Sequence, residues 1–291
     1  MGETDTRRST DKYNSAGAGH AKAVRRIETL YKRYHRPEYL SMDPLCWVRR
    51  FAGGPQPTVE AAALCAAVFS YGRVEQILRH LDRIESLTGR DLAAFTAETS
   101  FRRKQRLFSG CCHRFNDGTD LALLFEVIGR FQRRYRTLER LFCEPDAGDE
   151  PTIGPRMALF CRVVSDEAAA VSGARRPSFA YLFPSPAAGS ACKRLNMFLR
   201  WVVRPDDGID LGLWKRVRPA VLMMPVDTHV ARIARDLGMT RRSNADWRMA
   251  GEITDFLRLV DPADPVRFDF SLCRYGMVGA RRRKAGTDGR Q

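Results

Sequence analysis

The stretch Pro225-Val226-Asp227-Thr228-His229-Val230-Ala231-Arg232-Ile233 decides how this chain is interpreted. An aspartate that follows an apolar Pro-Val step is a typical N-cap, because its side chain accepts hydrogen bonds from the free N–H groups at the start of a helix. The same aspartate can act in catalysis if another helix brings a lysine to it. Lys193, in Gly189-Ser190-Ala191-Cys192-Lys193-Arg194, is the candidate. The residues leave both roles of Asp227 open.

Apolar residues on either side of this stretch recur at steps of three and four, which predicts helices rather than strands. The pattern is strong in Lys193–Val203, in Arg73–Leu87 and in Asp120–Tyr135. Thr58 is the expected N-cap of another helix, Val59–Ser70, with Glu60 in its first turn. Further helices are expected at residues 21–35, 43–45, 91–95, 154–170, 227–237, 244–260 and 265–275. No alternating strand pattern persists, so we expect an all-α fold.

Composition changes at the two ends of the chain and at one internal linker. Residues 1–20 are rich in Ser, Thr, Gly and charge, and we expect a disordered tail there. Residues 144–153 predict a linker. Residues 281–291 are expected to form a basic tail. The helical domain between the tails, 21–280, is expected to have two lobes, approximately 58–170 and 171–280 together with 21–57.

The charge of the chain favours a polyanionic partner. Its 291 residues carry a formal net charge of +15, from 49 Lys+Arg against 34 Asp+Glu. Such an excess indicates nucleic acid before an acidic membrane surface, although a genome that favours arginine would also produce it. Clusters that could form a phosphate-binding stripe are Arg102-Arg103-Lys104 with Arg106, Arg133-Arg134 with Arg136, Arg241-Arg242, and Arg281 to Lys284. No apolar run has transmembrane length and no secretory signal is seen, so we expect a cytoplasmic, nucleoid-associated protein.

The cysteines do not indicate a metal site. Eight are present, at positions 46, 65, 111, 112, 143, 161, 192 and 273. They form no CxxC pair and no His/Cys cluster with zinc-finger spacing. We therefore expect free, mostly buried thiols in a reducing compartment and no metal centre.

Two families share motifs with this chain. The segment from Pro225 to Arg232 resembles the helix start of the helix-hairpin-helix–GPD superfamily of DNA glycosylases, which includes endonuclease III-like and 8-oxoguanine glycosylases. Over nearly the whole chain, the order of segments also resembles an uncharacterised bacterial family of unknown function. The motifs of that family occur here as Pro184-Ser185-Pro186, Gly189 to Asn196, Arg204-x-Asp206-Asp207-Gly208, Leu213-Trp214 and the Asp227 motif.

The glycosylase resemblance implies a two-lobed, all-α helix-hairpin-helix–GPD fold and base-excision repair with AP-lyase chemistry. Asp227 falls on the superfamily's catalytic aspartate, and Lys193 is the candidate for its nucleophilic lysine. The implied partner is damaged or abasic duplex DNA, bound by a monomer. No cofactor is expected, apart from a monovalent cation that hairpin carbonyls can hold. The residues expected to contact DNA are Gly189, Ser190, Arg194, Arg232, His229 and Tyr71.

The chain departs from the superfamily pattern at its hairpin and at its end. Gly189 lies four residues before Lys193, whereas the usual hairpin has a glycine two residues before the lysine. The iron–sulfur cysteines of endonuclease III relatives are absent, since no cysteine follows Cys273. Two alternatives stay open: a non-catalytic nucleic-acid-binding module with the same fold, and a related enzyme that acts on RNA or nucleosides.

Base excision also requires an extruded nucleotide and a side chain that fills the gap it leaves. Tyr71 is a candidate because it ends an early helix, and Phe108 and Phe115 could stack on a base. For each of these aromatic residues, a place in the core is the alternative. His229 is expected to pack or form hydrogen bonds near the helix N-terminus rather than to act as a base.

Overall fold

The computed structural model describes residues 4–144 and 150–287, and most of these residues are helical. The helices are α1 (Thr4–Tyr34), α2 (Leu45–Val48), α3 (Gln56–Val68), α4 (Val74–Thr88), α5 (Leu92–Glu98), α6 (Phe101–Leu107), α7 (Gly118–Tyr135), α8 (Leu138–Phe142), α9 (Gly154–Ser172), α10 (Pro177–Ala180), α11 (Lys193–Val203), α12 (Thr228–Asp236), α13 (Trp247–Arg258) and α14 (Asp269–Thr287). A short antiparallel hairpin pairs β1 (Cys112–His113) with β2 (Asn116–Asp117). The expected all-α class is confirmed. None of the described helices combines the length and apolarity needed to cross a membrane.

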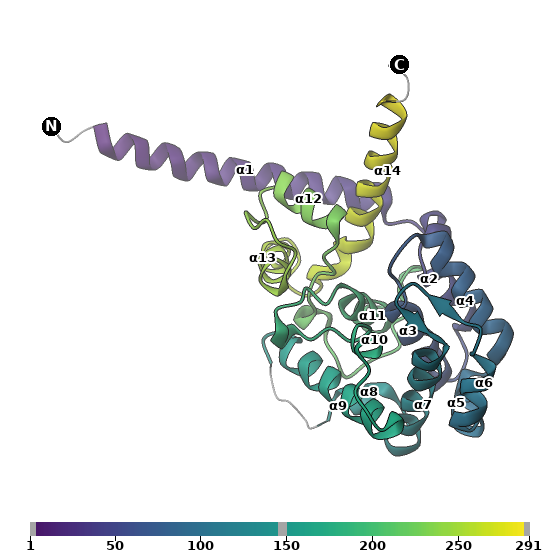
Figure 1. Cartoon of the computed structure of the whole chain (residues 1–291). Coiled ribbons are helices and arrows are strands. Elements are labelled where there is room, and N and C mark those ends of the chain that lie inside the picture. The colour runs from purple at the N-terminus through teal and green to yellow at the C-terminus, as the bar shows by residue number, and fades with distance from the viewer. Residues whose placement is uncertain (1–3, 145–149, 288–291) are drawn as a thin grey trace.

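The helices form two groups, which Figure 1 shows one above the other. Helices α12, α13 and α14 lie in the upper group together with α1, which packs against α14. Helices α2 to α10 make up the lower group, and α11 lies within it, packed against α3. The candidate lysine and aspartate therefore start helices that belong to different groups.

Helix α3 is the central support of the lower group. Nearly all of its residues are buried, so it has no solvent-facing side. Its buried alanines, among them Ala62, Ala63 and Ala66, have small side chains that allow neighbouring helices to approach closely, and α11 is one of the helices packed against α3. Phe198 and Trp201 of α11 are buried as well. The tight fit between α3 and α11 fixes where α11 begins, and so where Lys193 lies.

Helix α3 also starts earlier than the sequence pattern predicted, two residues before Thr58, because prolines are tolerated in a first helical turn. Thr58 is therefore inside the helix, where its hydroxyl oxygen lies 3.2 Å from the backbone nitrogen of Ala93. Glu60 is buried and accepts hydrogen bonds from Trp214 Nε1 and from the backbone N–H of Leu138, both at 2.7 Å. Its carboxylate joins α3 to α8 and Trp214 instead of complementing the dipole of α3.

Both expected tails differ from the structure where it describes them. Helix α1 begins at Thr4, so the segment predicted to be disordered is helical from that residue on. Helix α14 continues to Thr287 through most of the segment predicted to be a basic tail. No proline interrupts either segment, so the adjoining helix can propagate into it. Residues 1–3 and 288–291, and residues 145–149 of the expected linker, lie outside the described residues.

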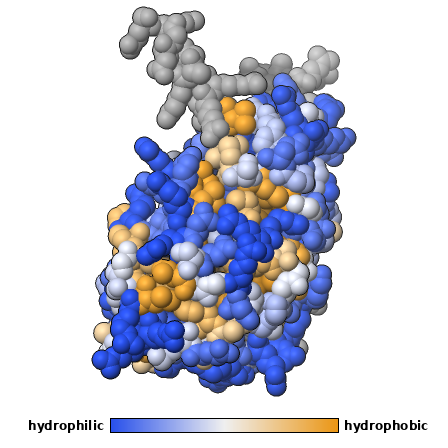
Figure 2. Space-filling model, turned by 90° about the vertical axis from the view of Figure 1, so that its right-hand side faces the viewer, coloured by the Kyte–Doolittle hydropathy of each residue, from blue (hydrophilic) through white to orange (hydrophobic). Residues whose placement is uncertain are grey.

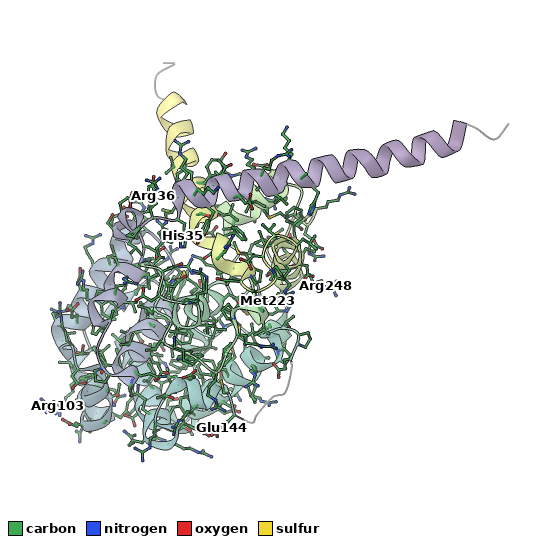
Figure 3. All side chains as sticks on the ribbon, turned by 180° about the vertical axis from the view of Figure 1, so that it is seen from behind. His35, Arg36, Arg103, Glu144, Met223 and Arg248 are labelled. Atoms are coloured by element: carbon green, nitrogen blue, oxygen red, sulfur yellow. The ribbon has the colours of Figure 1, made fainter. Side chains whose placement is uncertain are left out.

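The Arg204-x-Asp206-Asp207-Gly208 motif joins distant parts of the chain. Arg204 is buried and pairs with Asp264 at 2.8 Å and with Asp207 at 3.1 Å. His35 lies just after the end of α1 (Figure 3). Its Nε2 is 2.8 Å from Oδ2 of Asp207. Burial opposes ionisation of Asp207, but the hydrogen bond to His35 and the charge of Arg204 hold its pKa well below the usual range. The motif therefore has a structural role.

Candidate active site

The loop before α11 brings Lys193 to the first position of that helix. Gly189 has a φ of 77°, in the left-handed region that favours glycine. Cys192 has a φ of 47°, a conformation that costs free energy in a residue with a Cβ. The loop is held from outside, because the carbonyl of Gly189 accepts a 3.0 Å hydrogen bond from the backbone N–H of Trp247, the first residue of α13. The surrounding structure thus imposes the turn that starts α11.

Asp227 is the N-cap of α12 and also faces Lys193. Its Oδ1 accepts hydrogen bonds from the backbone N–H groups of His229 at 2.9 Å and Val230 at 2.8 Å. Its Oδ2 lies 3.9 Å from Nζ of Lys193. The two oxygens serve different functions, so the capping role and the pairing with Lys193 coexist in one side chain.

A cavity of about 510 Å³ opens beside this pair, between the two groups of helices. Its walls come from residues 42–44, from the turn and first residues of α4, and from α11, α12 and α14. This volume lies within the range of cavities that hold small ligands. Lys193 and Asp227 both line it, so a bound molecule would contact both groups.

Three other residues of this cavity were not singled out from the sequence. Asp269, the first residue of α14, is buried and pairs with Arg200 of α11. Burial raises the pKa of Asp269, which Arg200 partly offsets and the nearby Asp227 reinforces. Cys273 Sγ lies 3.9 Å from Oδ2 of Asp227. Burial raises the pKa of Cys273 to about 12, so at neutral pH it is a thiol that can donate to that oxygen. The site therefore contains a second ion pair, Arg200 with Asp269, and a thiol donor beside the Lys193–Asp227 pair.

Arg194, expected to contact DNA, is directed into the protein. Its guanidinium is buried and donates to the carbonyl oxygen of Val68 at 2.7 Å and to that of Tyr181. The same group lies 4.6 Å from the ring centroid of Tyr181 and 5.1 Å from that of Tyr71. Because it is the second residue of α11, it points away from the side that carries Lys193. It supports two surface aromatic rings rather than a phosphate.

The expected DNA contacts on α12 are turned toward α14. Arg232 Nη2 lies 3.4 Å from the carbonyl oxygen of Gly276. His229 lines the cavity, and a Cβ at Gly276 would lie 2.8 Å from the Cβ of His229. His229 thus packs close to the helix N-terminus, as the sequence suggested. Gly189 and Ser190 remain on the accessible side of the loop before α11.

Three aromatic residues form a cluster that adjoins, through Tyr71, residues that line the cavity. Tyr71 precedes Gly72 and Arg73, which line the cavity, and its ring contacts those of Phe115 and Tyr181. Phe115 is 61 % exposed, at the turn of the β1–β2 hairpin. Tyr71 is half-buried, with its hydroxyl 2.8 Å from the carbonyl oxygen of His113. Phe108 belongs to the core, and of the aromatic candidates Phe115 is the most accessible.

The basic clusters do not all face solvent. Lys104 is buried and pairs with Glu126 at 2.8 Å, so it is not part of a surface stripe. Arg133 lies 3.7 Å from the same carboxylate, and Arg242 pairs with Asp246 at 2.6 Å. Among residues 4–144 and 150–287, no group of three or more His, Cys, Asp or Glu is arranged to hold a metal ion. None of the eight cysteines forms a disulfide.

The fold and the site define a class of protein: an all-α protein in which a lysine and an aspartate line a cavity between helices. The chain belongs to the family described as protein of unknown function DUF2400, whose model matches residues 43–278. The resemblance to an uncharacterised family is thereby confirmed. The chain is also 29 % identical, over 267 residues, to a probable non-canonical nonribosomal peptide synthetase, CymA, of Salinispora arenicola. That alignment covers 83 % of this chain and 3 % of the synthetase, so the chain spans a small part of that relative. No solved structure matches.

Proposed function

We propose that this protein excises damaged bases from DNA, as a DNA glycosylase with AP-lyase activity that uses Lys193 as its nucleophile. The observation that carries the proposal is the 3.9 Å separation of Lys193 Nζ and Asp227 Oδ2 beside a cavity of about 510 Å³. The resemblance of the Asp227 motif to glycosylases and the net charge of +15 agree with it. The relation to glycosylases stays a prediction, since the family itself has no assigned function.

In the proposed reaction, an extruded nucleotide enters the cavity and presents C1′ to Lys193. The amine attacks in its neutral form, so a new Nζ–C1′ bond forms as the bond from C1′ to the base breaks. The electron pair of the broken bond leaves with the base, which takes up a proton. The nitrogen then loses one proton, and the sugar ring opens as O4′ takes up a proton, which gives a protonated Schiff base. A base removes a proton from C2′, and the electrons of that C–H bond expel the 3′ phosphate as the C3′–O bond breaks.

Asp227 has two functions in this scheme. Its Oδ2 faces Lys193 and can accept an ammonium proton, and its negative charge stabilises the positive charge that develops on the sugar. Its Oδ1 stays bonded to the start of α12, so the carboxylate is held in one orientation. The protonated thiol of Cys273 adds a donor toward Oδ2 without adding a second negative charge.

In this proposal, the aromatic cluster of Tyr71, Phe115 and Tyr181 supplies the side chain that fills the gap left by the extruded nucleotide. Removal of a base from the stack leaves a gap, and an exposed ring can fill it. Phe115 stands on a short hairpin, 61 % exposed, and its ring contacts those of Tyr71 and Tyr181. We assign the gap-filling role to Phe115, with Tyr71 as its support.

Borohydride trapping on duplex DNA that carries an abasic site tests the proposal. The aldehyde form of that sugar condenses with an amine, and reduction makes the bond permanent. We expect a covalent band with the wild-type protein and with Lys215→Ala, a control at an exposed lysine. Lys193→Ala should give no band, and Asp227→Asn a slower one.

Two results would contradict the proposal. A band of wild-type intensity in Lys193→Ala would exclude this lysine as the nucleophile. No band in any variant, with salt-sensitive DNA binding retained by all of them, would indicate a binding module instead. Preferential binding of RNA or single strands would favour the alternative substrate class.

A further inference from the structure

A second cavity, of about 360 Å³, lies on the outer side of α4 against the β1–β2 hairpin. Its walls are basic and contain no carboxylate. Figure 2, which shows the side of the molecule where α4 lies in Figure 1, displays a mainly hydrophilic surface with separate hydrophobic patches. The residues that line this cavity are Gln76, Arg79, His80 and Arg83 of α4, with Gly110, Cys111, Cys112, His113 and Arg114.

The three arginines of this cavity are exposed and lack an ionic partner. In the described ranges, no carboxylate lies within ion-pair distance of Arg79, Arg83 or Arg114. Glu75, one turn before Arg79 on α4, lines the first cavity and forms no ion pair with Arg79, and the other two carboxylates of α4 are engaged elsewhere. Asp82 pairs with Arg50 at 2.7 Å, and Glu85 pairs with Arg90 at 2.8 Å. The residues of α4 that line the second cavity are therefore basic or neutral, and its carboxylates lie outside that cavity.

The floor of the cavity carries a buried polar atom without a partner. His80 is 9 % exposed, and its Nε2 has no hydrogen bond within the described structure. Burial and the neighbouring His113 lower the pKa of His80 to about 4, so the ring is neutral at physiological pH. A neutral imidazole has one N–H to donate. Buried polar groups almost always have a partner, so Nε2 has an open hydrogen-bond position, and in the Nε2–H tautomer a ligand that brings an acceptor would fill it.

The second cavity shares a wall with the candidate active site. Gly72 lines the first cavity, and a Cβ at Gly72 would lie 3.3 Å from Cδ and Nη1 of Arg114, which lines the second. Glu75 of the first cavity and Arg79 of the second are four residues apart on α4, about 6 Å along the axis. A single strand could therefore place a nucleotide in one cavity and a nearby phosphate in the other.

We propose that this second cavity binds a backbone phosphate of the strand whose extruded nucleotide occupies the cavity of Lys193. The position of the strand rests on the proposed function, whereas the phosphate chemistry rests on the cavity alone. Guanidinium groups bind phosphate through paired N–H donors, and two of them separated by one helical turn can approach one phosphate from both sides. His80 would donate to the innermost oxygen. Arg114, whose guanidinium lies 5.4 Å from the ring centroid of Phe115, would link this phosphate to the gap-filling ring.

The test is the salt dependence of binding, measured by fluorescence anisotropy with a labelled abasic duplex. A plot of log Kobs against log salt has a negative slope, and each lost phosphate contact reduces the magnitude of that slope by about 0.9. The double variant Arg79→Gln with Arg83→Gln loses one phosphate contact, so the magnitude of its slope should be smaller than that of the wild type by about 0.9. The matched control is Arg140→Gln with Arg162→Gln, which removes the same charge at two exposed arginines of α8 and α9 that belong to none of the basic clusters named above.

A wild-type slope in the Arg79/Arg83 variant, or an equal decrease in the control, would overturn the proposal. Inorganic phosphate at constant ionic strength distinguishes a strand phosphate from free phosphate. If it shifts the ring signals of His80 while the slope of the variant is unchanged, the cavity binds free phosphate and the strand contact is wrong. If the wild-type protein traps no abasic DNA but the slope decreases as expected, the proposed chemistry fails and the phosphate site stands.

Discussion

The carboxylate of Asp227 lies 3.9 Å from the ammonium nitrogen of Lys193, although 34 residues (227 − 193) separate them along the chain. Each starts a helix, Lys193 at the first position of α11 and Asp227 at the N-cap of α12. Because backbone N–H groups hold Oδ1 of Asp227, Oδ2 is left to face the lysine. A structural cap thus also orients a candidate catalytic group.

Substitutions at Asp227 should separate its two roles. Asparagine caps a helix about as well as aspartate, so Asp227→Asn should change the free energy of unfolding by less than about 0.5 kcal/mol. Asp227→Ala removes the cap and should cost about 1 kcal/mol, measured by urea denaturation. Both should slow borohydride trapping strongly, since both lose the negative charge. Wild-type trapping by Asp227→Asn would show that the charge is not needed.

The substitution Gly276→Ala should displace α12, and with it Asp227, although Gly276 itself does not line the cavity. The new methyl group would lie 2.8 Å from Cβ of His229 and 3.0 Å from Cδ1 of Ile233, so α12 must move away from α14. We expect Gly276→Ala to destabilise the protein by about 1–3 kcal/mol and to slow trapping, because α12 carries Asp227. The control is Gly251→Ala, whose Cβ would lie 3.8 Å from Met223 Cε, an ordinary contact. If both variants trap abasic DNA equally well, the spacing of α12 and α14 does not set the geometry.

The substitution Phe115→Ala should weaken DNA binding and leave the stability of the fold almost unchanged. The side chain of Phe115 is 61 % exposed, so Phe115→Ala should change the free energy of unfolding by less than about 0.5 kcal/mol. Loss of a stacked ring should weaken binding of the abasic duplex by about 1–3 kcal/mol. Leu259→Ala, at a 71 % exposed leucine, is the control for loss of a surface apolar group. Unchanged DNA affinity in the Phe115 variant would remove this residue from the interface.

His80 should make the protein sensitive to acid. Its folded-state pKa of about 4 lies below the ordinary value of 6.5, so the unfolded state takes up a proton first as the pH falls. The contribution of His80 to stability is therefore present above pH 6.5 and is lost as the pH falls toward 4, by up to ~1.4 kcal/mol per pH unit. His80→Phe should reduce this slope in phosphate-free buffer, measured by urea denaturation at several pH values. An equal slope in both proteins would show that another group is responsible.

The sequence predicted the helix and the N-cap that carry Lys193 and Asp227, but not the tertiary contacts of the residues around them. Helix α11 has the bounds that the apolar pattern of Lys193–Val203 gave, and Asp227 is the N-cap that its motif indicated. These features depend on short windows, where periodicity and capping chemistry act locally. Arg194 could not be placed in this way. Its guanidinium donates to the carbonyl oxygens of Val68 and Tyr181, and the neighbouring sequence does not predict these contacts.

By itself, the sequence determined a basic, all-α chain with a capping aspartate on one helix and a lysine at the start of another. Only the tertiary structure decided that the two meet, that Asp269 and Cys273 of α14 line the same cavity, and that Arg79, Arg83 and Arg114 surround a second one. The physical reason is that helix formation follows local backbone and capping preferences, whereas a site is assembled by the packing of helices far apart in the chain. The close fit of α11 on α3 and of α12 on α14 sets those positions, and no local pattern encodes it.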